Sequence, residues 1–441
     1  MAPRLDSIVS SPALPDHAEV VVIGGGIIGC STALFLARKG IPVVVCEKGQ
    51  VGAEQSGRNW GWCRVQGRDP REIPLAIESL RLWRDPALGI GPAAAFRSCG
   101  ILYLAETAAE LNAYAAWLEA ARPWQLDSRL LSPSELQQAF PGLEAKVVGG
   151  LLTPSDGRAE PGRAAPAIAR AVQEAGGTVL TDCAVRAVET KGGRVSGVVT
   201  ERGPVACGSV VLAGGAWSRL FCGNIGIELP QLKVLSSVMR TEPATGGPEI
   251  SSVLSSWAFR RNDEGGCILA RGTLSYAVVT PDSFRLFRSY LPALRASWRE
   301  IRLHFGGEFL REAWTPRHWS ADSVTPFERR RVLDPEPRHR VLDRALASLR
   351  RAHPAFAGLK EAERWAGLID VTPDAVPVMS AVESLPGFFV ATGFSGHGFG
   401  IGPGAGRLMA DLATGAAPVV DSAPFRLGRF FDGSPMVVGG L

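Results

Sequence analysis

The chain of 441 residues lacks long apolar runs. No stretch reaches the roughly 18 apolar residues that are needed to span a bilayer, and the first 19 residues lack the apolar segment of a secretion signal. We therefore expect a cytoplasmic protein with no transmembrane segment. Peripheral contact with the inner face of a membrane stays open, because such contact needs no spanning segment.

Paired cysteines and a charge of one sign are missing too. The eight cysteines contain no CxxC pair and have no histidine at zinc-ligand spacing, so we expect neither a metal site nor a disulfide framework. The net charge is only +4 and the arginines are scattered, so we expect no nucleic-acid partner. The densest basic run, 329–331, is interpreted as a solvated loop or helix end, with a weak membrane contact as the alternative.

The composition is typical of a soluble globular protein with an extensive core. Hydrophobic residues make up 46% of the chain and charged residues 20%, and the 51 glycines indicate many tight turns or close backbone approaches. The length exceeds that of one ordinary compact core. We therefore expect two domains.

The strongest motif follows a predicted buried strand at 19–23. Gly24, Gly26 and Gly29 form a GxGxxG turn, after which apolar residues recur at helical spacing up to residue 39, and 42–47 predicts a second strand. In this arrangement the glycines allow a tight turn, close approach of a pyrophosphate and close helix–strand packing. Glu47 ends the second strand, where a carboxylate accepts hydrogen bonds from ribose hydroxyls. The unit predicts dinucleotide binding, but does not separate FAD from NAD.

Segments of this cofactor-binding kind recur at three separated places along the chain. This pattern predicts an α/β fold in which a discontinuous Rossmann-like nucleotide-binding domain carries an inserted mixed-sheet α+β substrate domain. The predicted bounds are 1–80, 145–225 and 356–441 for the nucleotide-binding domain, and 81–144 and 226–355 for the substrate domain.

Four segments together resemble the D-amino-acid oxidase-like superfamily of flavoproteins, which includes D-amino acid dehydrogenases, glycine oxidase and sarcosine oxidases. They are the strand and turn at 20–29 with Glu47, the loop 54–59, the strand and turn at 210–217, and the region from Thr372-Pro373-Asp374 to Gly404. Their order along the chain is also that of the family, and the resemblance covers nearly the whole chain. It implies that the dinucleotide is FAD.

The resemblance also implies the residues that contact the cofactor. Ser56, Gly57, Arg58 and Asn59 match positions that line the pyrophosphate and the flavin. Val185 matches a position whose backbone meets the adenine, and Ala213, Gly214 and Trp217 match the neighbouring wall. The predicted cofactor-binding set also contains Ile27, Ile28, Lys48, Gly61, Gly393, Ser395, Gly396, His397, Gly398, Phe399 and Gly400.

The glycine-rich loop 393–401 has a physical role of its own. A helix that we expect at about 403–414 begins just after it, so N–H groups at the helix start point toward a reduced flavin, which carries negative charge near N1 and C2=O. His397 invites assignment as a catalytic base. Because hydride transfer from a neutral amine needs no base, a structural or flavin-contacting role is favoured.

One position departs from the family pattern. In many amino-acid-oxidising relatives an arginine before the Thr-Pro-Asp motif binds the substrate carboxylate, and Ile369 stands at the matching position here. Arg64 and Arg271, which we expect in a strand, are the candidate replacements, since a buried carboxylate needs a paired charge. Trp62 and Tyr276 are candidate pocket walls. The candidate catalytic set, with substrate-pocket or flavin-contact roles, is Arg64, Arg271, Tyr276 and His397.

These features predict an FAD-dependent amine or amino-acid oxidase or dehydrogenase. The substrate is expected to be a small amine or amino acid, either a D-amino acid or an N-substituted one, whose C–N bond is oxidised to an imine by hydride transfer to flavin N5. The electron acceptor is oxygen, a quinone or an electron-transfer protein. Two alternatives stay open: an FAD-bearing subunit of a multi-protein amine, opine or proline-type dehydrogenase complex, and a non-catalytic FAD-binding scaffold.

Overall fold

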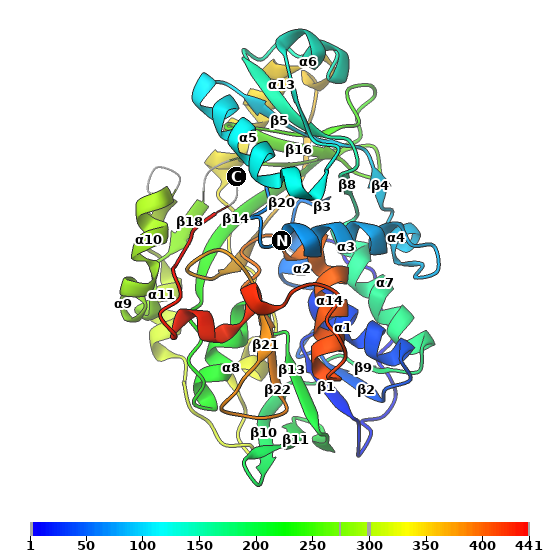
Figure 1. Cartoon of the computed structure of the whole chain (residues 1–441), viewed down its shortest axis with the longest axis vertical. Helices are drawn as coiled ribbons and strands as arrows, with labels where there is room; N and C mark the ends of the chain where they lie inside the picture. Colours follow the sequence, from blue (N-terminus) through cyan, green and yellow to red (C-terminus); the bar gives the residue numbers. More distant parts are fainter. Residues whose placement is uncertain (1–2, 273–274, 298–300, 440–441) are drawn as a thin grey trace.

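The computed structural model describes residues 3–272, 275–297 and 301–439. Within these ranges, six strands form one sheet in the order β21-β22-β13-β1-β2-β9, parallel except for β21. Figure 1 shows this sheet in the lower half of the molecule, beside α1, α7 and α14. Its strands are β1 (Val20–Ile23), β2 (Val43–Cys46), β9 (Thr178–Leu180), β13 (Ser209–Leu212), β21 (Val378–Ala381) and β22 (Phe388–Thr392).

Strand β1 is apolar throughout because both faces of its sheet are covered. Val20 and Val22 belong to the core cluster that includes the helices α1, α7 (Pro161–Glu174) and α14 (Gly398–Ala413). Val21 and Ile23 point to the opposite face and pack with apolar residues of a three-stranded sheet. Alternate side chains thus enter two different cores, which explains why the predicted strand shows no alternation of polar and apolar residues. The three-stranded sheet consists of β10 (Val185–Lys191), β11 (Arg194–Thr200) and β12 (Gly203–Ala206).

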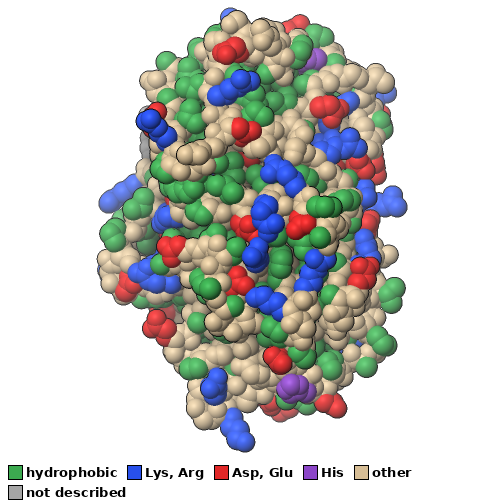
Figure 2. All heavy atoms as spheres, turned by 45° about the vertical axis from the view of Figure 1, so that its right-hand side comes forward, with side chains coloured by type: hydrophobic (Ala, Val, Ile, Leu, Met, Phe, Trp, Pro, Cys, Tyr) green, Lys and Arg blue, Asp and Glu red, His purple; other side chains and the backbone are tan. Residues whose placement is uncertain are grey.

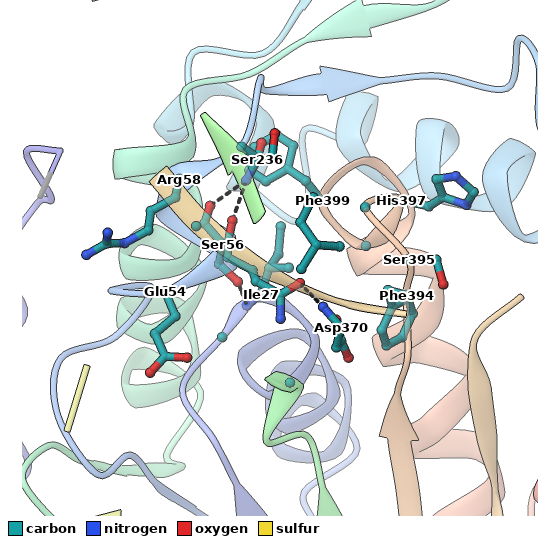
Figure 3. A pocket seen from close by; sticks show the side chains of 18 of the residues that line it. Ile27, Glu54, Ser56, Arg58, Ser236, Asp370, Phe394, Ser395, His397 and Phe399 are labelled. Carbon is teal, nitrogen blue, oxygen red and sulfur yellow. Dashed lines mark hydrogen bonds between the residues drawn. The ribbon is translucent and has the colours of Figure 1, made fainter. Parts of the chain in front are cut away.

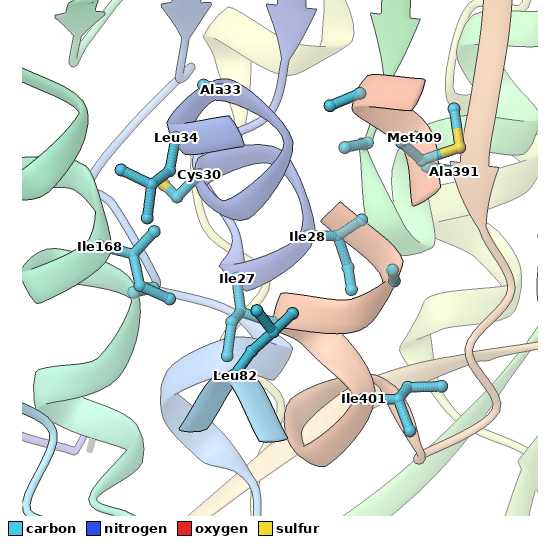
Figure 4. Packing of buried hydrophobic residues seen from close by; sticks show 14 of the residues in the cluster. Ile27, Ile28, Cys30, Ala33, Leu34, Leu82, Ile168, Ala391, Ile401 and Met409 are labelled. Atoms are coloured by element: carbon cyan, nitrogen blue, oxygen red, sulfur yellow. The ribbon is translucent and has the colours of Figure 1, made fainter. Parts of the chain in front are cut away.

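Helix α1 (Ile27–Arg38) packs closely on its neighbours through glycines. A Cβ added at Gly29 would stand 2.0 Å from the carbonyl oxygen of Gly24, and one added at Gly406 of α14 would stand 2.3 Å from the Cβ of Ser31. Figure 4 shows the apolar side chains of this contact, with Ile28 of α1 facing α14. Larger residues at either glycine would push the helix away from the strand or from α14.

A second sheet lies above the first in Figure 1. It contains ten strands of the described ranges, in the order β19-β18-β14-β17-β16-β15-β5-β7-β6, with β20 also paired to β14. Its strands are β5 (Ile101–Ala105), β6 (Arg129–Leu131), β7 (Gly149–Thr153), β14 (Leu232–Thr241), β15 (Ser251–Leu254), β16 (Trp257–Arg261), β17 (Cys267–Ala270), β18 (Ser275–Val278), β19 (Ile301–His304) and β20 (Glu361–Val371).

The two faces of this sheet have different neighbours. Helix α13 (His339–Ala352) places Leu342, Leu346 and Leu349 against one face, at the spacing of an amphipathic helix. On the other face Tyr103 of β5 and Val238 of β14 line a large cavity between the sheets. One face is therefore committed to packing, and the other is available for a ligand.

The domain bounds given above stay a prediction, and the sheets cross them at two places. Strand β7 and strand β20 pair within the ten-stranded sheet, although 145–225 and 356–441 were assigned to the nucleotide-binding domain. Apolar runs of this kind predict a strand but do not identify its partner, because pairing depends on segments far away in the sequence. Strands β7 and β20 therefore lie near predicted cofactor segments in the sequence but pair in the ten-stranded sheet.

The surface is mixed in charge, and basic and acidic side chains are interspersed on the face in Figure 2. Arg329 ends helix α12 (Pro326–Arg329), as expected for the basic run, but Arg330 and Arg331 make ion pairs with Glu308 and Glu201. In the described part of the chain, we find neither a helix of the length and hydropathy required to cross a bilayer nor a His, Cys, Asp and Glu cluster suited to a metal ion.

Candidate active site

A cavity of about 930 Å³ lies between the two sheets and takes lining residues from most parts of the chain. Figure 3 shows part of its wall, with Ser56 and Arg58 on one side and the loop from Phe394 to Phe399 on the other. The structure brings most of the predicted residues together here. They are Gly24, Gly26, Ile27, Ile28, Glu47, Lys48, Ser56, Arg58, Asn59, Gly61, Arg64, Val185, Ala213, Gly214, Trp217, Arg271, Ser395, Gly396, His397, Gly398 and Phe399.

Five predicted residues are not among those that line the cavity, and four of them are glycines. Gly29 packs under Gly24, and a Cβ at Gly57 would stand 2.5 Å from Leu5 Cδ2. Gly393 N donates to Asp370 Oδ2 at 2.6 Å, and Gly400 O accepts from α3. Glycine-rich segments place some glycines toward a ligand and others toward protein, which the sequence pattern does not distinguish.

Tyr276 is the fifth. It lies in β18, and the guanidinium carbon of Arg338 stands 4.9 Å from the centre of its ring. The ring packs beside Leu235 and Leu368 in a satellite core cluster. Trp62, the other predicted pocket wall, does line the cavity. The same reasoning predicted both aromatic residues as pocket walls. The strands with which they pair determine which of the two lines the cavity.

The glycine turn and helix α1 form one end of the cavity. Gly26 precedes the first helical residue, and the backbone N–H of Ile27 donates to Ser56 Oγ at 2.9 Å. The segment 54–59 was expected to be a loop, but its centre forms the short helix α2 (Gln55–Arg58). The hydrogen bond to Ser56 ties this segment to the start of α1, where free N–H groups and the helix dipole favour an anion. Ser56, which the resemblance predicted, thus contacts the helix start that follows the glycine motif.

Glu47 lies beside this turn at the end of β2. Its Oε2 accepts from Gly25 N at 2.7 Å and its Oε1 accepts from Gly49 N at 2.8 Å, while burial raises its pKa. Backbone donors fix both carboxylate oxygens, and each keeps a lone pair for a further donor. The side chain is therefore held in place to accept hydroxyl groups from the cavity.

Lys48 and Trp217 are joined through Glu54. Lys48 Nζ lies 2.8 Å from Glu54 Oε1, the indole N–H of Trp217 donates to the same oxygen at 2.9 Å, and Lys48 Nζ stands 5.0 Å from the Trp217 ring. Val185 lines the cavity nearby with Phe221 and Phe327. This end thus has an apolar wall next to a hydrogen-bonded charged group, as a purine with its ribose requires.

Helix α14 begins at Gly398, about five residues before the predicted start, and Pro403 lies inside it. A proline at this position removes one backbone donor and ordinarily breaks a helix. Here Ser79 of α3 (Ile73–Arg84) bridges the next gap: Gly404 N donates to Ser79 Oγ at 3.1 Å, and Ser79 Oγ donates to Gly400 O at 2.8 Å. The predicted start was wrong because this support comes from another helix. The N–H groups of the first turn therefore open directly at the cavity.

His397 is the residue just before α14. Its Nδ1 lies 3.1 Å from Oε2 of the fully buried Glu72, and Figure 3 shows its ring directed away from Ser56 and Arg58. Burial, assisted by the nearby Arg68, lowers the pKa of His397. Glu72 thus orients the ring, which fits a positioning role for His397 better than that of a base.

The predicted carboxylate anchors both line the cavity. Arg64 follows β3 (Trp62–Cys63), and Arg271 comes directly after β17, one residue beyond the strand that was expected to contain it. Arg271 makes no hydrogen bond or ion pair with any described residue, and its Nε is buried. Ile369 lines the same cavity from β20. Arg64 and Arg271 therefore line the same cavity as Ile369, the residue at the position of the expected arginine.

Sequence reasoning missed Arg68 and Tyr103. Arg68 is 2% exposed, lines the cavity and has a buried Nη1 with no partner among the described residues. It lies four residues after Arg64 in the irregular, arginine-containing segment 52–69, and that spacing was the available signal. Tyr103 belongs to an apolar strand that gives no sign of facing a ligand.

The chain is similar to many known proteins. The sequence model described as FAD dependent oxidoreductase (DAO) matches residues 19–412. Sarcosine oxidase subunit beta of Rhodobacter capsulatus is 26% identical over 96% of this chain and 91% of that protein, and glycine oxidase of Pseudomonas aeruginosa is 26% identical over 92% and 98%.

Among solved structures, the L-amino acid deaminase of Proteus myxofaciens in complex with anthranilate superimposes with a TM-score of 0.93. It is 32% identical, and the match covers 98% of this chain and 97% of that one. The glycine oxidase of Geobacillus kaustophilus gives a TM-score of 0.74 at 20% identity and supports the fold alone.

Proposed function

The chain belongs to the FAD dependent oxidoreductase (DAO) family and is an FAD-dependent enzyme, and on that premise we propose that it oxidises the C–N bond of a small amino acid to an imine. The family assignment confirms the resemblance based on the four sequence segments. Relatives named as sarcosine oxidase, glycine oxidase and L-amino acid deaminase support a substrate with a carboxylate next to an amine.

The cavity fits an extended FAD. Val185, Glu47 and the α1 start would hold the adenine, the ribose and the pyrophosphate in that order, and Arg58 with the loop 395–399 would hold the flavin. Arg58 is 3% exposed, donates through Nη1 to Asp334 and Ala366 O, and has a buried Nη2 with no hydrogen-bond partner in the described part of the chain. An orphaned buried donor beside the cavity supports a polar ligand at this point.

One observation carries the proposal of a carboxylate substrate. Arg271 lines the cavity, its Nε is buried, and no described group forms a hydrogen bond or ion pair with it. A buried guanidinium nitrogen without a partner is costly, and a bidentate carboxylate restores the missing interactions. Arg271 therefore takes the place of the arginine that Ile369 has replaced.

The chain's own residues position the substrate and exclude water. Bound FAD would supply a two-electron oxidant, so that the carbon next to nitrogen loses one hydride, which carries both electrons. The nitrogen loses a proton, and water then hydrolyses the imine to an oxo acid and an amine or ammonia. Arg271 orients the donor carbon, and the α14 start stabilises negative charge on the cofactor side.

Substitution of Arg271 tests this function. Arg271→Gln should raise KM for amino-acid substrates by about 10- to 100-fold, because a charge-assisted hydrogen-bonded pair contributes about 1.5–3 kcal/mol. Arg271→Lys should recover part of the loss, and Arg194→Gln, an exposed arginine on β11, is the matched control. Equal KM values in Arg271→Gln and the native enzyme would exclude Arg271 as the anchor.

A second candidate is the flavin-bearing subunit of a larger complex. Several relatives are named as sarcosine oxidase subunit beta, which supports this candidate. We propose an assay of the purified chain with an artificial electron acceptor to separate the two. Turnover without a partner favours the single-chain enzyme, whereas reduction of the flavin only after addition of a partner subunit favours the complex.

We also propose that the electron acceptor is reached at a membrane surface. One side of the molecule carries an apolar face formed by α9 (Pro281–Arg285), α10 (Phe287–Ser297) and α11 (Gly307–Trp314), which group together in Figure 1, and by β19, which pairs with β18. Its exposed large side chains are Phe284, Phe287, Leu303, Phe305, Leu310 and Trp314. Exposed arginines at 285, 288, 302 and 311 surround them. This combination is typical of proteins that dock on anionic lipid.

The apolar face is close to the cavity, because Ala296 of α10, a helix of this face, lines the cavity. A quinone dissolved in the membrane would therefore be near the flavin. This position favours a quinone over oxygen as the acceptor.

A further inference from the structure

Three arginine side chains line the cavity around Tyr103. The guanidinium carbon of Arg64 lies 5.6 Å from the centre of the Tyr103 ring, and Arg68 Nε donates to Arg64 O at 3.4 Å. Arg64 and Arg68 are thus neighbours on one side of the ring. The hydroxyl of Tyr103 has no hydrogen-bond partner among the described residues, so it is also available to a ligand.

Arg271 reaches the same wall from the other side. Tyr103 of β5 is in register with Val253 of β15, and a Cβ added at Gly272 would stand 3.0 Å from Val253 Cγ2. The residue after Arg271 therefore packs on the strand neighbour of Tyr103. The Arg64–Arg68 pair and Arg271 are placed on one continuous surface of the cavity.

No described carboxylate forms an ion pair with any of these three arginines. Arg64 Nη1 donates to Gln66 O, while Arg68 Nη1 and Arg271 Nε are buried and have no hydrogen-bond partner among the described residues. Burial and the neighbouring Arg64 lower the pKa of Arg68 to about 10, so it is still charged at neutral pH. The cavity wall thus carries three positive charges.

The acidic groups nearby are engaged elsewhere. Glu72 bonds to His397, and Glu110, which also lines the cavity, caps its own helix by accepting from Thr107 N at 3.1 Å. Asp156 accepts from two backbone N–H groups, burial raises its pKa to about 7, and it acts on Arg64 and Arg68 through space without an ion pair. Direct ion pairs with the three arginines are therefore left for a ligand to form.

We infer that the substrate carries two carboxylates, one held by Arg271 and the other by the Arg64–Arg68 pair. A single carboxylate satisfies one bidentate guanidinium and leaves the other two unpaired. The inference rests on the proposed function and names its substrate class: an amine with two carboxylates, in the form of an amino dicarboxylic acid or an N-carboxyalkyl amino acid. The bonds broken and formed are those of the imine-forming step given above.

Matched substrate pairs test this inference in the holoenzyme. Anaerobic reduction of the flavin is followed with glutamate against glutamine, in both chiral forms, and with iminodiacetate against N-methylglycine. In at least one pair, the dicarboxylate should reduce the flavin with a second-order rate constant at least about tenfold larger than that of its monocarboxylate partner. The reason is that a substrate without the second carboxylate leaves charged groups of a desolvated site unpaired, which weakens its binding. The pair that shows this difference indicates whether the substrate is an amino dicarboxylic acid or an N-carboxyalkyl amino acid. Equal rates within both pairs would overturn the inference and leave amino-acid oxidation intact.

A binding measurement keeps the inference separate from turnover. If no compound reduces the flavin, the proposed function fails. Calorimetry then compares the affinity for glutarate, a dicarboxylate, with the affinity for 4-carbamoylbutyrate, its monocarboxylate analogue. Affinity for glutarate at least about tenfold higher supports the inference of two carboxylates, and equal affinity overturns it. Arg64→Gln should remove the preference for the dicarboxylate, and Arg194→Gln should retain it. A preference unchanged in Arg64→Gln would exclude the Arg64–Arg68 pair.

Discussion

We propose that cofactor binding depends most directly on Gly26. A Cβ at this position would stand 3.1 Å from Ser56 Oγ, which already accepts the Ile27 N–H, and the two further carbons of a valine would extend into the space before α1. We predict that Gly26→Val purifies with at least about tenfold less FAD, because the pyrophosphate loses its backbone donors. FAD released on denaturation, measured per polypeptide, checks this. Normal occupancy would show that the phosphate lies elsewhere.

The pH dependence of stability should reveal the environment of His397. Because burial lowers its pKa, the unfolded chain binds this proton more readily than the folded chain. The contribution to the free energy of unfolding is therefore complete above about pH 6.5 and is lost as the pH falls toward the folded pKa. In urea denaturation between pH 7.5 and pH 5, we expect His397→Gln to show a shallower decline than the native enzyme. Parallel pH profiles would contradict a lowered pKa.

Much of the cofactor site was accessible from sequence, but the substrate site was not. Glu47 and Ser56 belong to local motifs whose geometry is repeated from protein to protein, so their positions followed from spacing and resemblance. Tyr103 and Tyr276 depend on strand pairing within the ten-stranded sheet, which brings Tyr103 to the cavity and places Tyr276 in a core cluster. Side-chain type alone does not contain this information.

At the scale of elements, α3 supports α14 at the point where Pro403 interrupts it. Ser79 bridges Gly404 N and Gly400 O, so Ser79→Ala removes the partner of the buried Gly404 N, whereas Gly400 O keeps the indole N–H of Trp83. We predict a loss of about 1–3 kcal/mol in the free energy of unfolding together with weaker FAD retention, since α14 begins at the cavity. Urea denaturation and flavin release measure the two effects.

Ser134→Ala in α6 (Pro133–Ala139), an exposed position, is the matched control for Ser79→Ala. A loss of stability no larger than that of this control would show that the bridge is unimportant. The same bridge explains why the sequence predicted the end of α14 well and its beginning poorly. A proline signals a helix start, and the compensating hydroxyl lies more than 300 positions away in the chain.

At the scale of the whole molecule, the apolar face predicts attachment to lipid. Native protein should sediment with vesicles that contain anionic lipid and only weakly with neutral ones, because arginines surround the exposed rings. Phe305→Glu combined with Trp314→Glu should lower this binding at least about tenfold, given about 1.5–3 kcal/mol for burial of one large apolar side chain.

Phe431→Glu, which changes an exposed ring outside the apolar face, is the control for the vesicle experiment. Binding that survives the double substitution, or that is lost equally in the control, would contradict docking through α9–α11. Activity with a soluble dye should be the same in all three proteins, since none of the substituted residues lines the cavity. Catalysis and membrane docking are thus separable in one set of variants.

The central claim is that FAD in this cavity accepts electrons from an amine whose carboxylate is held by Arg271. Anaerobic titration of the holoenzyme with D-amino acids, L-amino acids and N-substituted amino acids tests it most directly. We predict that at least one of these compounds bleaches the oxidised flavin band, and that Arg271→Gln shifts the half-saturating concentration upward. A flavin that no amino acid bleaches, or one that bleaches equally well with simple amines and in Arg271→Gln, would contradict the account.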